Sequence, residues 1–279
     1  MTLNFAGKLV DASQILVMGI INLNHDSFFP GSRARNESDL LQKVEQQLAE
    51  GADIIDLGFM SSRPGAKVSD PGEEAENIGK AIDVVLQHFP DTILSVDTLH
   101  SAVAEHSIAL GARMINDISA GTYDENMLST VSKYKVPYCI MHMKGLPENM
   151  QEDTTYEDVV LDVVYYLAER KKAAREAGII DVVVDPGFGF GKSIDQNYEL
   201  LNKLKFCNTL DAPVLVGLSR KSMIYKYLDI SPEEALNATT ALHMMALQNG
   251  AHILRVHDVR PAKECIKMFK KYSNPLTKP

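Results

Sequence analysis

The chain has 279 residues and a formal net charge of −9, and 45% of its residues are hydrophobic and 23% charged. These values are ordinary for one globular domain with a buried core, so we expect a single domain over residues 1–279. The acidic total and the lack of a Lys/Arg-rich block argue against a nucleic-acid surface. No segment has the ~18 consecutive apolar residues of a membrane span or the pattern of a signal peptide, so we expect a cytoplasmic protein with no membrane partner.

Eight short apolar runs alternate with longer segments of helical period. The runs cover residues 15–21, 53–57, 92–96, 113–118, 137–142, 181–185, 213–218 and 252–256. Near-continuous apolar runs are typical of strands that are covered on both faces. Their alternation with helical segments predicts parallel βαβ units.

Eight such units in this length favour a (β/α)8 barrel, the α/β TIM barrel, which needs ~250 residues. An open, doubly wound sheet is the alternative, and it would also bind ligands at the carboxyl ends of its strands. We expect residues 3–10 to form a small hairpin or cap at the bottom of the barrel. Helices are predicted within 38–52, 72–89, 101–112, 156–178 and 232–251. Ser38 is predicted as the N-cap of the first helix.

Polar or ionisable side chains follow every apolar run. They include Asn22, Asp56, Asp97, Asn116, His142, Asp185, Ser219, Arg220, Lys221, Arg255 and His257. In a barrel the carboxyl ends of the strands converge on one mouth, where active sites lie. Each residue alone has a simpler interpretation: Asp97 could cap the next helix, and His142 could be a packed, hydrogen-bonded histidine. The occurrence of such residues after all eight runs favours a site.

The residue types indicate two kinds of contact. Asp97, Asn116 and Asp185 could bind the amide and amine edges of a planar heterocycle through complementary hydrogen bonds. Their spacing does not indicate a zinc site.

A second group is positively charged. Arg63, Arg220, Lys221 and Arg255 could hold phosphate oxygens, although Arg220 could instead pair with a nearby carboxylate. The glycine-rich segment 185–192 does not match a nucleotide-binding motif, and its glycines could let the backbone approach a flat ligand closely.

Taken together, these segments resemble the dihydropteroate synthase family. The matching stretches are MGIINLNHDSF (18–28), DLGFMSSRPGA (56–66), SVDT (95–98), INDI (115–118), MHMKG (141–145), DPGFGFGK (185–192), GLSRKS (217–222) and RVHDV (255–259). They run in the family's order and span almost the whole chain.

The resemblance implies a transferase of folate biosynthesis. Its substrates would be 6-hydroxymethyl-7,8-dihydropterin diphosphate and 4-aminobenzoate, and its products 7,8-dihydropteroate and diphosphate. It implies catalytic roles for Asp97, Asp185, Lys221 and Arg255, and a Mg2+ ion near Asn22 in a homodimeric protein. The implied substrate contacts are Ser62, Arg63, Pro64, Asp97, Asn116, Asp185, Phe190, Gly217, Ser219, Lys221, Arg255 and His257.

The chain departs from the family in two loops. Asn24 and His25 stand where Thr and Pro are usual, and Phe59, Met60 and Ser62 replace Gly, Glu and Thr. Both loops are expected to serve the aminobenzoate step. Two other hypotheses therefore stay open: a pterin-binding paralogue with reduced or no turnover, and a methyltetrahydrofolate-dependent methyltransferase.

Overall fold

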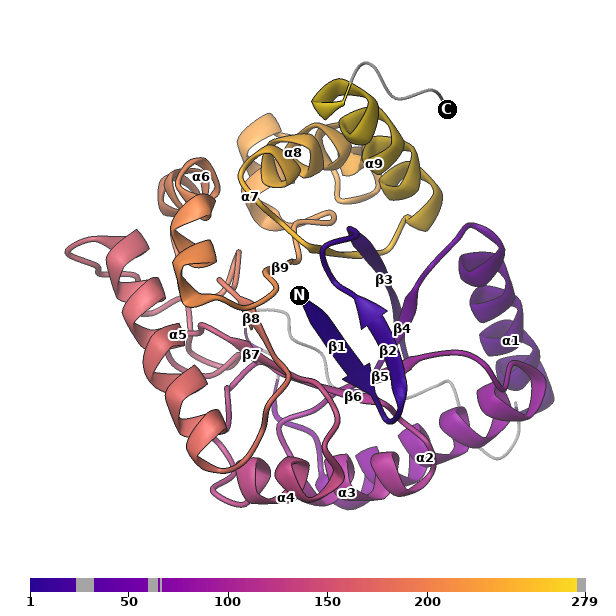
Figure 1. The fold of residues 1–279 in the computed structure, drawn as a ribbon. Coiled ribbons are helices and arrows are strands. Elements are labelled where there is room, and N and C mark those ends of the chain that lie inside the picture. The colour runs from indigo at the N-terminus through magenta and orange to yellow at the C-terminus, as the bar shows by residue number, and fades with distance from the viewer. Residues whose placement is uncertain (24–32, 60–64, 66, 275–279) are drawn as a thin grey trace.

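Eight parallel strands form the centre of the molecule (Figure 1). The computed structural model describes residues 1–23, 33–59, 65 and 67–274, with the backbone alone for residues 33–36. The strands are β3 (Leu16–Asn22), β4 (Ile54–Gly58), β5 (Leu94–Asp97), β6 (Met114–Asp117), β7 (Tyr138–Met141), β8 (Val182–Asp185), β9 (Leu215–Val216) and β10 (Ile253–Val256). Their order is β8-β7-β6-β5-β4-β3-β10-β9, and a parallel bridge between Val184 and Val214 joins the two ends. The predicted barrel is confirmed.

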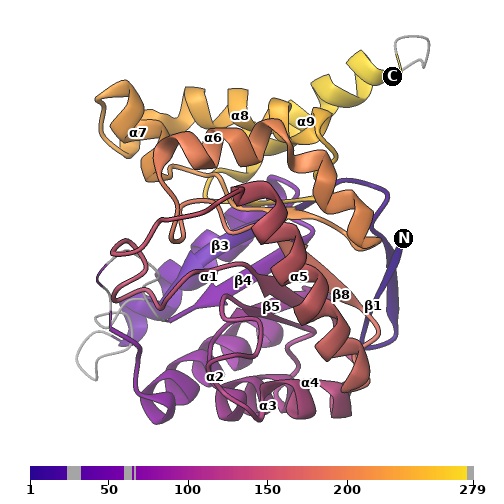
Figure 2. The ribbon, with the colours of Figure 1, turned by 90° about the vertical axis from the view of Figure 1, so that its left-hand side faces the viewer.

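Helices surround this barrel (Figure 2). They are α1 (Arg33–Ala49), α2 (Pro71–His88), α3 (Ser101–Ala109), α4 (Met127–Tyr134), α5 (Val159–Glu176), α6 (Ile194–Asn202), α7 (Ser222–Leu228), α8 (Leu236–Gln248) and α9 (Val259–Ser273), with 3-10 turns η2 (Leu204–Leu210) and η3 (Glu233–Ala235). None of the helices in the described ranges is long and apolar enough to cross a membrane.

The first helix begins earlier than predicted. Ser38 lies inside α1, which starts at Arg33, so the predicted N-cap is wrong. The preceding Arg and Ala residues favour helix, and they let the helix extend past the serine. Elsewhere the local signals do cap helices: the Asp70 side chain accepts from the amides of Gly72 and Glu73 at the start of α2.

A two-stranded hairpin, β1 (Thr2–Phe5) and β2 (Lys8–Asp11), covers one end of the barrel (Figure 1). Its tight turn places Gly7 at φ 98°, a conformation that glycine adopts readily. The fully buried Phe5 side chain belongs to the same apolar cluster as Met18, Ile54 and Val183 at the amino-terminal ends of the strands. The predicted hairpin is confirmed, and it closes the end of the barrel opposite the predicted site.

We expect Phe5→Ala to destabilise the protein by about 3–5 kcal/mol, because it leaves a cavity beneath the hairpin. Leu9→Ala is the matched control, since this hairpin side chain is 70% exposed and its loss should cost about 0.5 kcal/mol or less. Denaturant unfolding measures both. An equal loss in the free energy of unfolding for the two variants would show that the hairpin does not cover the core.

Candidate active site

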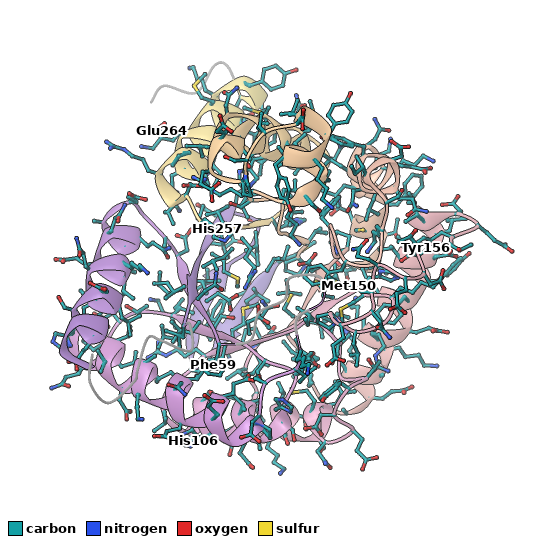
Figure 3. The ribbon with its side chains drawn as sticks, turned by 180° about the vertical axis from the view of Figure 1, so that it is seen from behind. Phe59, His106, Met150, Tyr156, His257 and Glu264 are labelled. Carbon is teal, nitrogen blue, oxygen red and sulfur yellow. The ribbon has the colours of Figure 1, made fainter. Side chains whose placement is uncertain are left out.

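Strand alternation aims two different layers of side chains into the barrel. In β6, β8 and β10, Met114, Val183 and Ile253 belong to the apolar cluster under the hairpin. Two residues further along the same strands lie Asn116, Asp185 and Arg255, on the same face because the side-chain period of a strand is two. The residues between them pack against the helices. The interior is therefore apolar at the hairpin end and polar at the other end. Figure 3 views the molecule from the side opposite to Figure 1 and labels His257, two residues after Arg255.

Arg255 joins two carboxylates from neighbouring strands. Its Nε lies 2.7 Å from Asp56 Oδ2, and its Nη2 lies 2.7 Å from Asp97 Oδ2. Asn116 Nδ2 donates to Asp56 Oδ2 at 3.1 Å, and Asp56 is fully buried. One guanidinium thus balances two carboxylates, and the amide of Asn116 is held in a fixed orientation.

The pKa of Asp97 reflects the sharing of the Arg255 guanidinium with Asp56. Burial raises the pKa of Asp97 to about 7; Arg255 acts in the opposite direction, and the Asp56 charge raises it further. Two acidic groups cannot both be fully neutralised by one cation in a buried site. Burial and the Asp56 charge therefore hold the pKa of Asp97 above that of an exposed carboxyl group.

Asp185 and Lys221 lie on the other side of the mouth, close enough for each charge to affect the other's pKa. Asp185 Oδ1 accepts a hydrogen bond from Gly187 N at 2.7 Å. Lys221 Nζ donates to Phe188 O and lies 4.2 Å from the centre of the Phe190 ring. Burial raises the pKa of Asp185 against the effect of Lys221. Burial also lowers the pKa of Lys221 to about 8, and Asp185 opposes that shift.

Arg220 and Lys221 point to different partners. Arg220 binds Asp258 with two hydrogen bonds, from Nε at 2.8 Å and Nη2 at 2.9 Å. Of the two interpretations of Arg220, the structure therefore favours pairing with a carboxylate over phosphate binding. Ser219 Oγ lies 3.0 Å from His257 Nδ1 and accepts from His257 N at 3.2 Å, so these two predicted residues are neighbours.

Two predicted residues leave space at the mouth. A Cβ at Gly217 would meet no heavy atom within 4 Å. Asn22 is exposed at the end of β3, and the strand register aligns it with Gly58 and Gly58 with Asp97. Asn22 therefore lies near Asp97 with its amide accessible to a ligand.

Part of the predicted site falls outside the described residues. Ser62, Arg63 and Pro64 lie there, together with the substituted Asn24, His25 and Met60. Of the substituted loop residues, Phe59 is described, and its side chain is buried in the main apolar core.

The structure supports the simpler interpretation of His142, that of a packed, hydrogen-bonded histidine. The ring is buried and its Nδ1 lies 2.9 Å from Lys192 Nζ. Burial and the Lys192 charge lower the pKa of His142 to about 2, so the ring is neutral. Sequence reasoning missed the roles of Asp56 and Lys192, although both stand in segments that it singled out: a strand end and the glycine-rich segment.

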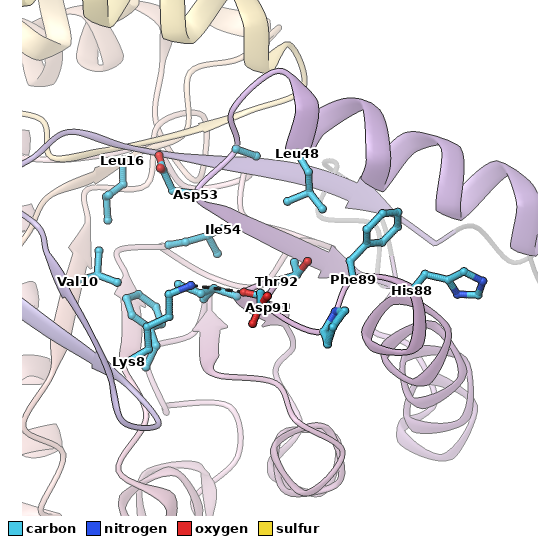
Figure 4. A pocket seen from close by; sticks show the side chains of 14 residues that line it. Lys8, Val10, Leu16, Leu48, Asp53, Ile54, His88, Phe89, Asp91 and Thr92 are labelled. Carbon is cyan, nitrogen blue, oxygen red and sulfur yellow. Dashed lines mark hydrogen bonds between the residues drawn. The ribbon is translucent and has the colours of Figure 1, made fainter.

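A cavity away from the mouth lies beside the hairpin (Figure 4). It has a volume of about 590 Å3, with Phe5, Lys8, Ile54 and Phe89 in its walls. Lys8 Nζ donates to Asp91 O there at 3.4 Å. None of its lining residues is a predicted site residue, so it is separate from the polar mouth.

Comparisons with known proteins agree with this geometry. Residues 18–257 match the family model described as "Pterin binding enzyme". A dihydropteroate synthase of Haemophilus influenzae is 40% identical over 270 residues, which cover 96% of this chain and 97% of that protein.

Solved structures match as closely. The Yersinia pestis dihydropteroate synthase in complex with a sulfonamide drug has a TM-score of 0.91 and 36% identity, covering 98% of this chain and 99% of that one. The Thermus thermophilus dihydropteroate synthase in complex with 4-aminobenzoate has a TM-score of 0.86 and 35% identity, covering 97% and 99%. With a family model matched over residues 18–257 and near-complete coverage of relatives in both directions, this chain belongs to the dihydropteroate synthase family of pterin-binding enzymes.

Proposed function

We propose that this protein joins 6-hydroxymethyl-7,8-dihydropterin diphosphate to 4-aminobenzoate, with release of diphosphate. The observation that carries the proposal is the convergence of Asp97, Asn116 and Asp185 with Lys221 and Arg255 in one barrel mouth. The acidic and amide groups suit a pterin ring, and the cationic groups suit its anionic leaving group.

The two carboxylates would also act on the reaction itself. When diphosphate departs, positive charge develops on the methylene carbon and the pterin ring. Asp97 and Asp185 are fixed by hydrogen bonds to Arg255 and Gly187, so their charges need not reorganise as that positive charge appears. The aromatic amine attacks as the free base, so the step needs no strong general base.

The amine would lie beside Phe190 and Ser219. The Phe190 ring is almost buried and packs against the Lys221 ammonium, and Ser219 neighbours His257. Ser62, Arg63 and Pro64 complete the proposed aminobenzoate contacts. This assignment rests on the family motifs, since those three residues are outside the described ranges.

Arg255 and His257 would bind the leaving diphosphate, with Mg2+ near Asn22. Mg2+ prefers oxygen ligands and usually keeps several waters, with few protein ligands and the substrate phosphates. The exposed residue Asn22 carries an amide oxygen, a ligand type that fits that pattern. In a site of this kind the diphosphate and water would supply most of the ion's ligands. When bound, Mg2+ would neutralise charge on the leaving group.

The decisive experiment measures diphosphate release by purified protein with Mg2+ and the pterin diphosphate, with and without 4-aminobenzoate. We expect release that depends on the amine. Lys221→Ala should abolish most of it, while Lys226→Ala, which changes an exposed lysine of α7, should not. Pterin binding without release would indicate the inactive paralogue, and methyl transfer from methyltetrahydrofolate would indicate the methyltransferase.

We also propose that the protein is a homodimer. Support comes from large apolar side chains that are exposed on α7, α8 and α9: Tyr227, Leu228, Met245, Met268 and Tyr272. Exposed apolar surface on neighbouring helices is typical of protein interfaces. Sedimentation equilibrium should give twice the mass of one chain, and a single-chain mass would contradict the proposal.

A further inference from the structure

The glycine-rich segment after β8 has an unusual supply of hydrogen-bond donors. Each backbone carbonyl from Gly187 to Gly191 accepts from a side chain. Lys192 Nζ donates to Gly187 O at 2.8 Å and to Phe190 O at 3.0 Å. Lys221 Nζ donates to Phe188 O between them. Gln151 Nε2 donates to Gly189 O at 2.9 Å, and Tyr156 Oη donates to Gly191 O at 2.8 Å. The segment is thus held by side chains rather than by a helix or a sheet.

Its backbone conformation explains why side chains are needed. Gly187, Gly189 and Gly191 have φ values of 69°, 83° and 60°, which prevent regular secondary structure. Buried carbonyl groups without a partner are costly, so partners must come from elsewhere. The segment also packs tightly: a Cβ at Gly187 would lie 1.9 Å from His142 O.

Lys192 is the central donor of this arrangement. Its side chain is 3% exposed, and besides the two carbonyls its Nζ contacts His142 Nδ1 at 2.9 Å. His142 O lies farther from Nζ, at 3.5 Å, so the three donors of an ammonium can serve the three nearer acceptors. Burial lowers the pKa of Lys192 to about 7, and the nearby Asp185 carboxylate opposes that shift.

The location of these contacts gives them a consequence for the site. The two carbonyls that Lys192 binds flank Phe188 and Gly189, and the second belongs to Phe190 itself. The Phe190 ring in turn lies 4.2 Å from Lys221 Nζ. A change at Lys192 would therefore shift Phe190, while Asp97 and Asn116, on other strands, would stay in place.

We propose that Lys192, assisted by Gln151 and Tyr156, is a positioning residue that sets the Phe190 side of the amine subsite. Only the kinetic part of this proposal rests on the proposed function. Figure 3 labels Tyr156 and Met150 in the β7–α5 segment, which supplies the two assisting donors.

Hydrogen exchange tests the structural part without any turnover. Gly187 N donates to Asp185 Oδ1, Gly189 N donates to Asn197 Oδ1, and Phe190 N donates to Gly187 O, so their amides report on the segment. Lys192→Met should accelerate their exchange about 10-fold or more. The matched control is Lys171→Met, because Lys171 also donates to two carbonyls, those of Leu210 and Asp211, away from the mouth. It should change the same amides by less than about 3-fold.

Steady-state kinetics tests the functional part. Lys192→Met should raise the KM for 4-aminobenzoate about 10-fold, and the KM for the pterin diphosphate by less than about 3-fold. Lys171→Met should leave both constants unchanged. A purely structural lysine would lower the amount of folded enzyme and the melting temperature without separating the two constants, and that result would overturn the proposal.

A second set of variants covers the case in which Lys192→Met does not fold. Tyr156→Phe removes the donor to Gly191 alone, and Gln151→Ala removes the donor to Gly189. Both should produce smaller shifts in the same direction, in exchange and in the KM for the amine. Unchanged exchange in these folded variants would overturn the proposal. If the wild-type protein showed no turnover, the exchange result would still decide whether the donors hold the segment.

Discussion

Asp185→Asn should reduce kcat by about 100- to 1000-fold, the usual effect of removing one preorganised group that stabilises transition-state charge. Asparagine keeps the size of the side chain, and its Oδ1 can still accept from Gly187 N, as Asp185 Oδ1 does at 2.7 Å. The change therefore removes the negative charge and little else. That charge is the group proposed to stabilise the cation formed on diphosphate release.

Single-turnover diphosphate release at saturating substrates measures this effect apart from binding. Asp195→Asn is the control, because it makes the same chemical change at an exposed position in the first turn of α6. Loss of the Asp185 charge should also lower the stability of the charged Lys221 nearby, so the melting temperature is recorded with the rate. A kcat within about 3-fold of wild type would exclude Asp185 from charge stabilisation.

Arg255→Met should lower the free energy of unfolding by about 3–5 kcal/mol, since it leaves buried carboxylates without their cation. Asp56 is fully buried and Asp97 nearly so, and each lies 2.7 Å from the guanidinium. Arg260→Met should cost about 0.5 kcal/mol or less, because Arg260 is exposed and makes a 3.7 Å surface pair with Glu264. Chemical denaturation compares the two variants.

The loss at Arg255 should depend on pH in a defined direction. The pKa of Asp97 is already raised to about 7 with Arg255 present, and without the cation it rises further. A buried acid of this kind is stable when protonated and destabilises the fold as the pH rises through its folded-state pKa. The defect of Arg255→Met should therefore be larger at pH 8.5 than at pH 6. Adding Asp56→Asn should recover part of it, and a defect that does not change with pH would contradict the ion-pair explanation.

The sequence by itself determined the architecture of this protein. Each of its eight apolar runs overlaps one strand of the barrel, three strands extend one residue past the run, and the hairpin at 3–10 was predictable from the residues ahead of the first run. These features depend on local periodicity and strand propensity, which can be read directly from the sequence. Local signals were less reliable where several good helix formers adjoin, as at Ser38. The helices α4, α6, α7 and α9 lie outside the five segments predicted as helical. The first three have only about two turns, which carry too little periodic signal to separate them from loops.

Only the tertiary structure decided how the site residues pair. Arg255 and Arg220 are both arginines at strand ends, yet one joins Asp56 and Asp97 and the other binds Asp258. That difference depends on the register of the barrel, which brings together groups far apart in the chain. The role of Lys192 also depends on the fold. In the sequence it is the last residue of a glycine-rich segment, and in the structure it is the buried donor that holds that segment. Desolvation and pairing are properties of the assembled barrel, so no local pattern reveals them.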